Sequence, residues 1–260
     1  MVQRIAVLSD IHGNADALDV ALSQVEAEAP DLVVILGDLL TYGTQPLTVL
    51  DRLDAFSRGN RARVFISGNH DEFYFGLETG DPGFYDRVPD FVRESVYWTQ
   101  DRIAPHPHLS ARYPWVRSHT EQAVVFAHAN PYRYGDWRYV SDPEACRDAA
   151  ATLAAMGARV GVFGHSHRAF AALVAQGAVR ALDQGVWHEI EPEAVAIINP
   201  GAVGHPRGTG LSYLRLDVDG ARIRADIRAI AFDAAAQRRA IAAAGFTAGT
   251  RDKLLSYWET

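Results

Sequence analysis

The chain has 260 residues, 48% of them hydrophobic and 22% charged, which is typical of a folded globular domain. Its formal net charge of −7 argues against a stable nucleic acid partner, because no excess of positive charge is available to bind a polyanion. A single cysteine excludes an intrachain disulfide, and we find no signal peptide or membrane-spanning run, so we expect a cytoplasmic protein without a membrane partner.

The first 71 residues alternate between two kinds of pattern. Short β-rich runs lie at residues 4–10, 31–38 and 63–71, and amphipathic helical patterns lie between them at residues 14–29 and 46–59. The second run is almost continuously apolar, as expected for a strand that is buried on both faces. This β-α-β-α-β order predicts right-handed crossovers and a parallel sheet.

Residues 73–120 interrupt this alternation. They are rich in aromatic residues, prolines and arginines, and we expect irregular loops around one helix at about 89–103. We interpret them as a cap-like insertion within a single domain that spans residues 1–260. Their rings either contact a substrate or pack the small core of the insertion itself.

The second half predicts a more antiparallel arrangement. Strand patterns at residues 123–129 and 159–167 flank a helical pattern at 143–157. Further short β runs follow between residues 169 and 230, and an Asp-Gly pair at 219–220 favours a hairpin. Alanine-rich helical segments end the chain.

Polar side chains follow five of the predicted strands. Each alone has an ordinary interpretation as a turn or loop residue. In open α/β sheets, however, the carboxyl ends of the strands form the ligand site, so together they indicate one site at one edge. The candidates are Asp10, His12, Asp38, Asn69, His70, Asp71, His128, His165 and His167.

These side chains suit a metal centre. Oxygen and nitrogen donors without a thiolate favour manganese, iron, zinc or a similar ion. An Asp-x-His pair can supply one oxygen and one nitrogen to an ion, and an aspartate from the next strand can bridge two ions with its two oxygens. Paired cations can hold a phosphoryl oxygen and lower the pKa of a water molecule, which is the chemistry of phosphate-ester hydrolysis.

The order of the motifs "LSDIHGN", "LGDLL", "SGNHDEF", "AHANP" and "FGHSH" resembles that of the calcineurin-like metallophosphoesterase superfamily. The later stretch "NPGAVGHPR" resembles small bacterial and archaeal phosphodiesterases of this group. The resemblance implies an α/β fold, a four-layer α-β-β-α sandwich of two mixed sheets. It also implies two divalent metal ions, with manganese expected first and iron, zinc, nickel or cobalt as alternatives.

The resemblance assigns a ligand set to each ion. The first ion would be held by Asp10, His12 and His167, the second by Asn69, His128 and His165, with Asp38 as the bridge between them.

The resemblance further implies hydrolysis by a metal-bound hydroxide. His70 matches a non-ligand histidine near the leaving-group oxygen, and we expect Asp71 to orient its imidazole. Protein serine/threonine phosphatases carry Gly-Asp-x-x-Asp-Arg-Gly, whereas this chain has "GDLLTYG" and lacks that arginine. Arg207 is therefore our candidate for a substrate contact, and His205 beside it is a weaker one.

These features predict a hydrolase of small phosphodiesters or nucleotides. A phosphomonoesterase, a dinucleoside polyphosphate hydrolase and a metal-binding scaffold are the alternatives. The acidic charge disfavours a nuclease. The sequence leaves the substrate, the metal and the oligomeric state open.

Overall fold

The structure is a computed structural model that describes residues 1–81, 88–106 and 108–259. Strands of one sheet are β1 (Gln3–Leu8), β2 (Leu32–Ile35), β3 (Ala62–Ile66), β4 (Trp115–Val116), β10 (His188–Glu189), β12 (Ser212–Asp219) and β13 (Arg222–Ala229). Strands of the other are β5 (Ser118–Glu121), β6 (Val124–Ala127), β7 (Val160–Phe163), β8 (Phe170–Ala175), β9 (Ala178–Leu182) and β11 (Val195–Asn199). The helices are α1 (Ala15–Glu28), α2 (Pro46–Ser57), α3 (Asn69–Thr79), α4 (Asp90–Ile103), α5 (Leu109–Arg112), α6 (Pro143–Ala155), α7 (Ala234–Ala243) and α8 (Ala248–Ser256).

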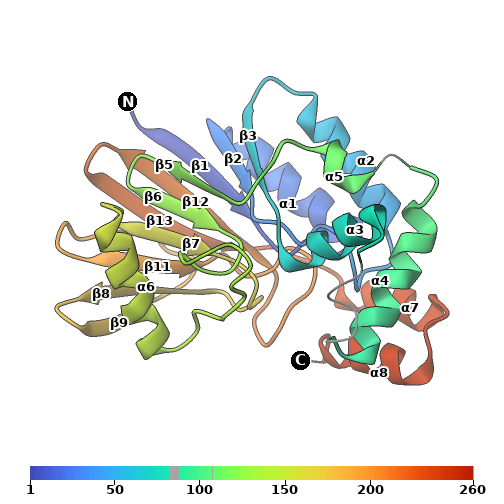
Figure 1. The fold of residues 1–260 in the computed structure, drawn as a ribbon. Coiled ribbons are helices and arrows are strands. Elements are labelled where there is room, and N and C mark those ends of the chain that lie inside the picture. The colour runs from blue at the N-terminus through green and yellow to red at the C-terminus, as the bar shows by residue number, and fades with distance from the viewer. Residues whose placement is uncertain (82–87, 107, 260) are drawn as a thin grey trace.

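The two sheets stack between helices and form the expected four layers (Figure 1). The first sheet has the order β10-β13-β12-β1-β2-β3-β4, and the second has the order β5-β6-β7-β11-β8-β9. Both sheets contain parallel and antiparallel pairs. The predicted α/β sandwich of two mixed sheets is confirmed.

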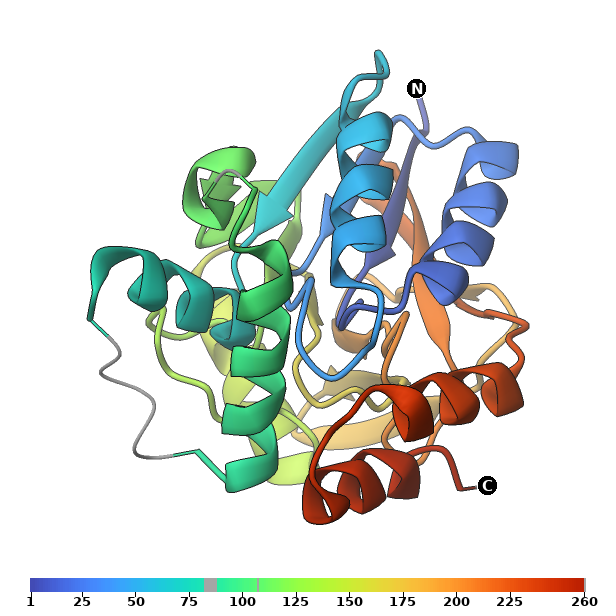
Figure 2. The same cartoon turned by 90° about the vertical axis from the view of Figure 1, so that its right-hand side faces the viewer.

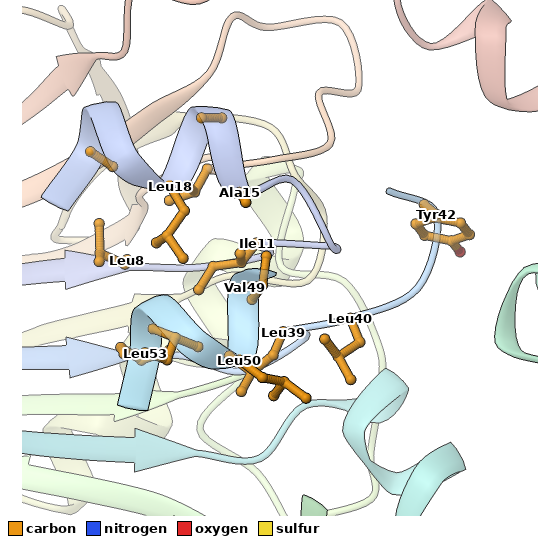
Figure 3. Packing of buried hydrophobic residues seen from close by; sticks show 14 of the residues in the cluster. Leu8, Ile11, Ala15, Leu18, Leu39, Leu40, Tyr42, Val49, Leu50 and Leu53 are labelled. Carbon is orange, nitrogen blue, oxygen red and sulfur yellow. The ribbon is translucent and has the colours of Figure 1, made fainter. Parts of the chain in front are cut away.

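Three apolar clusters hold these layers together. One lies between the first sheet and its helices and includes Leu18 of α1 and Leu53 of α2 (Figure 3). A second, with Val34 and Ile198, fills the space between the sheets, and a third packs α6 on the outer face of the second sheet. Burial of apolar surface on both faces explains why β2 has no polar residue.

The parallel order predicted for the start of the chain is confirmed. β1 pairs with β2 and β2 pairs with β3, in both cases in parallel. The hairpin is confirmed too, because β12 and β13 pair antiparallel across Gly220, which has the positive φ of 59° that such a turn requires. No helix in the described ranges is long and apolar enough to cross a membrane.

The segment 73–120 contains more regular structure than we expected, including the short helix α5 where we predicted a loop. The helix near 89–103 is confirmed as α4, but an unpredicted helix, α3, already begins at Asn69 within the run that we assigned to a strand. The end of the segment forms β4 and β5, which are edge strands of the two sheets. β4 has two residues and β5, with the sequence SHTE, has no apolar residue, so neither carries a strand pattern. Residues 82–87 and 107 of this segment lie outside the described part, and its assignment as an insertion stays a prediction.

Candidate metal centre

The candidate ligands meet at one end of the two sheets because each follows a strand or begins the next element. They come after β1 (Asp10, His12), β2 (Asp38), β3 (Asn69), β6 (His128) and β7 (His165, His167). The structure groups six of them into two buried, overlapping sets of donor atoms, and Asn69 lies against one set.

The backbone of these loops is unusual. Five of the predicted ligands have a positive φ, a conformation that few residues other than glycine adopt. Such strained residues persist only where surrounding contacts hold them, and they concentrate at functional sites. They are Asp10 (53°), His12 (46°), Asp38 (55°), His165 (63°) and His167 (58°).

The first donor set consists of Asp10, His12, His167 and Asp38. The Nε2 atoms of His12 and His167 lie 3.1 Å apart, and His167 Nε2 is 3.4 Å from Asp10 Oδ1. His12 Nε2 is 3.6 Å from Asp38 Oδ2. Donor atoms bound at about 2.1 Å to one ion lie about 3 to 4 Å from one another, so this spacing fits a single divalent ion.

The second donor set consists of Asp38, His128 and His165. His128 Nε2 lies 3.4 Å from Asp38 Oδ2 and 3.1 Å from the Asn69 side-chain oxygen. Asn69, the first residue of α3, can therefore add a neutral oxygen donor to this set.

Asp38 faces both sets with one oxygen. Its Oδ2 is the atom near His12 and near His128, whereas its Oδ1 accepts a hydrogen bond of 2.8 Å from the backbone N–H of His70. Oδ2 therefore faces both sets, while Oδ1 helps to hold the start of α3. Bridging by Asp38, which we expected to use both oxygens, stays a prediction.

Backbone carbonyls orient all four imidazoles. The Nδ1 atoms of His12, His128 and His167 lie 2.6 to 2.9 Å from the carbonyl oxygens of Leu40, Leu36 and His205. His165 uses its other nitrogen, with Nε2 3.0 Å from the Trp137 carbonyl oxygen. A nitrogen that donates to a carbonyl leaves its partner nitrogen as a lone-pair donor, so His12, His128 and His167 present Nε2 and His165 presents Nδ1.

Burial and the two carboxylates set the charges in the metal-free cluster. Burial, together with the nearby Asp38 charge, raises the pKa of Asp10 to about 7, although His128 opposes this shift. Burial lowers the pKa of His12 to about 4 and that of His165 to about 3. Burial acts in the same direction on His128, but Asp38 outweighs it and raises that pKa to about 9.

Two buried carboxylate oxygens give further evidence that the cluster suits divalent ions. Asp10 Oδ1 and Asp38 Oδ2 are buried and accept no hydrogen bond within the described part of the chain. Buried carboxylate oxygens without a partner are costly, and a cation between them removes that cost. Neighbouring glycines permit the close approach, because a Cβ at Gly68 would collide with Asp38 and one at Gly164 would collide with Ser9.

His70 lies beside the ligands and outside both donor sets. Its ring is 5.0 Å from that of His12, and its Nε2 lies 3.2 Å from the Tyr42 hydroxyl. Its Nδ1 is buried and has no hydrogen-bond partner among the described residues. This placement suits a group that serves the substrate and binds no ion.

Asp71 does not have the role that we expected. Both of its oxygens accept backbone N–H groups, from Gly68 and Asp38 at 2.8 Å and from Leu39 at 3.1 Å. The partner of the His70 imidazole is Tyr42 instead. Asp71 therefore fixes the loop that carries Asp38, and the orientation of His70 falls to a tyrosine that the sequence analysis missed. The positive φ of Tyr42, 65°, has no signature in the sequence.

Arg207 lies at the edge of the cluster, on a loop fastened to the ligand loop after β1. In this loop the N–H of Val203 donates to Ser9 O and that of Gly204 to Asp10 O. One guanidinium nitrogen of Arg207 donates to the Tyr139 hydroxyl at 3.2 Å. His205, two residues earlier, is buried against the Tyr42 ring at 4.5 Å.

Comparisons with known proteins agree with this geometry. A family model, the calcineurin-like phosphoesterase, matches residues 3–169, which is more than half of the chain. The uncharacterized protein MJ0912 of Methanocaldococcus jannaschii is 27% identical over 207 residues, covering 78% of this chain and 77% of the relative.

Two solved structures share the fold over nearly the whole length. The metallophosphoesterase of Sphaerobacter thermophilus has a TM-score of 0.71 and 23% identity, covering 98% of this chain and 100% of its own. The hypothetical protein PH1004 of Pyrococcus horikoshii OT3 has a TM-score of 0.73 and 14% identity, and the match covers 96% of this chain and 97% of that protein. The family match spans every predicted ligand, and the buried Asp/His cluster suits divalent metal ions. The chain belongs to the calcineurin-like phosphoesterase family, whose members are metal-dependent phosphoester hydrolases.

Proposed function

We propose that this protein hydrolyses small phosphodiesters or nucleotides at a dinuclear site, with manganese as the preferred metal. The observation that carries the proposal is the single oxygen of Asp38 that faces both donor sets, with His70 next to them. Two ions bound there would act as Lewis acids on the phosphoryl oxygens and lower the pKa of a water molecule.

The side chains around the cluster supply the remaining functions. His70 can give a proton to the leaving oxygen, and the Tyr42 hydroxyl holds its ring at 3.2 Å. Arg207, at the edge of the cluster, can donate to a phosphate group of the substrate, because its Nε is buried without a hydrogen-bond partner in the described ranges. The six aspartate and histidine ligands are at most 8% exposed, whereas Asn69 is partly exposed, so solvent reaches the cluster mainly from the side of Asn69.

The first test is the hydrolysis of bis(p-nitrophenyl) phosphate by metal-stripped protein before and after reloading with Mn²⁺. We expect turnover only in the reloaded protein, and slower turnover of the monoester p-nitrophenyl phosphate. Faster cleavage of the monoester would replace the diesterase with a phosphomonoesterase. No cleavage of either ester, with two ions bound, would favour the scaffold.

A second test separates His70 from the ligands. We expect His70→Ala to retain both ions and to reduce turnover by about 10²- to 10⁴-fold, the usual contribution of a general acid. His188→Ala is the matched control, since His188 lies on β10 and its ring hydrogen-bonds to the Asp183 carbonyl, away from both donor sets. Loss of an ion in the His70 variant would make His70 a ligand.

A further inference from the structure

Aromatic rings extend from the metal-ligand cluster toward the C-terminal helices. The Tyr42 ring stacks on His205 and lies 6.1 Å from Phe91 of α4. Tyr257, just after α8, has its ring 4.6 Å from His205 and 6.5 Å from Phe91. Helix α8 packs on α4, so two segments far apart in the sequence form this wall together (Figure 2).

Two cations lie on this wall. The guanidinium carbon of Arg207 is 5.8 Å from the centre of the Tyr257 ring, and Lys253 Nζ is 4.5 Å from the same centre. Lys253 also lies 5.8 Å from the Phe91 ring and is the only lysine of the chain. Both charges therefore gather around one side chain next to the cluster.

Within residues 1–81, 88–106 and 108–259, neither cation forms an ion pair with a carboxylate. Elsewhere arginines pair with carboxylates, for example Arg112 with Asp54 and Arg215 with Asp226, each closer than 3 Å. Arg207 donates to the neutral Tyr139 hydroxyl. Lys253 lies over the Tyr257 ring and forms no ion pair with a carboxylate of the described residues. In a chain of net charge −7, two unpaired cations beside a phosphoesterase centre are available for an anionic ligand.

We propose that Arg207 and Lys253 form a second anion subsite, which binds a further phosphate group of the substrate beside the phosphate that is cleaved. This inference rests on the proposed function for the position of the cleaved phosphate. It narrows the substrate to phosphate esters that carry a second phosphate, such as nucleoside bisphosphate esters. Simple diesters would fill only the metal side of the site.

The test is a binding measurement, so that it does not depend on turnover. We compare the affinities of the Mn²⁺-loaded protein for thymidine 3′,5′-bisphosphate and thymidine 5′-monophosphate by isothermal titration calorimetry. We expect the bisphosphate to bind about tenfold more tightly, the gain from charge-assisted hydrogen bonds to one phosphate. Equal affinities would overturn the subsite even if the enzyme cleaves bis(p-nitrophenyl) phosphate, and failure of that cleavage alone would count against the proposed function.

Variants locate the effect. We expect Lys253→Gln to reduce the preference for the bisphosphate over the monophosphate from about tenfold to about threefold. Lys253→Arg should restore it, because the subsite requires a positive charge. Arg239→Gln is the matched control, since Arg239 is a cation of α7 that pairs with Asp233 and is 72% exposed. An equal fall of this preference in the Lys253→Gln and Arg239→Gln variants would mean that only net charge matters, and would overturn the subsite.

Discussion

The two donor sets share Asp38 but differ in their surroundings. In the first set, Asp10 and His12 are fully buried and His167 is 1% exposed. In the second set, His165 is 8% exposed and is held by the carbonyl of Trp137. The first set thus lies inside the fold, whereas the second lies against the loop that precedes α6.

Their charges differ as well. Burial lowers the pKa of His12 to about 4, so this imidazole is already neutral at pH 7 and ready to bind an ion. In the second set, Asp38 raises the pKa of His128 to about 9, against the effect of burial, so the metal-free protein holds a proton there. One shared carboxylate therefore serves two sets that differ in their readiness to bind an ion, because Asp38 faces a protonated, cationic imidazole on only one side.

The largest effect is expected for Asp38→Asn, which removes the feature that the two sets share. We expect loss of ions from both sets and a fall in activity of about 10⁴-fold, because metal ions contribute several kcal/mol and about 1.4 kcal/mol corresponds to a factor of ten. Metal content per chain, measured after gel filtration, gives the first result and ester hydrolysis the second. Full activity with two bound ions would remove the bridging assignment.

Variants of one ligand separate the sets. We expect His167→Ala to weaken Mn²⁺ binding in the first set by at least about 100-fold, and Asn69→Ala to weaken it in the second by about 10-fold, since a neutral amide is the weaker ligand. Titration of metal-stripped protein with Mn²⁺ measures both affinities. If each variant weakened both sets equally, the sets would not be independent.

The pH dependence of metal binding distinguishes the sets without mutation. Metal binding requires a neutral His128, so affinity in the second set should rise about tenfold for each pH unit up to about 9 and then level off. In the first set the group that limits binding is Asp10, whose pKa burial raises to about 7, so the rise should end there. Calorimetry in two buffers of different ionisation enthalpy counts the protons released. Identical pH profiles for the two ions would contradict this difference.

Much of the metal centre can be predicted from sequence, because each ligand directly follows a short apolar run. Asp10 and Asp38 illustrate this, since parallel strands place their carboxyl ends at the same edge whatever the loop detail. Hydrogen bonds between side chains and distant backbone groups leave no such pattern in the sequence. The three N–H groups that bind Asp71, and the carbonyl that orients His165, depend on how separate loops pack. The subsite residue Lys253 lies even further from the motifs, on a helix placed only by tertiary contacts with α4.

The smallest effect is expected at Tyr42, which lies on the side of the first set. Its hydroxyl contacts His70, and its ring packs 4.8 Å from that of His12, whereas none of its described ring contacts involves a ligand of the second set alone. Figure 3 shows the Tyr42 side chain on the loop after Leu40, apart from the aliphatic residues of the cluster.

Tyr42→Phe should therefore retain both ions and lower turnover by about 3- to 10-fold, the effect of one hydrogen bond of about 0.5 to 1.5 kcal/mol. Tyr42→Ala also removes the ring, and we expect it to weaken Mn²⁺ binding in the first set while leaving the second unchanged. Metal titrations and ester hydrolysis of the two variants separate the hydroxyl from the ring. If Tyr42→Ala weakened Mn²⁺ binding in the second set instead, the contact between the Tyr42 and His12 rings would not support the first set. The loops around His167 and His205 would then have to account for the burial of the first set.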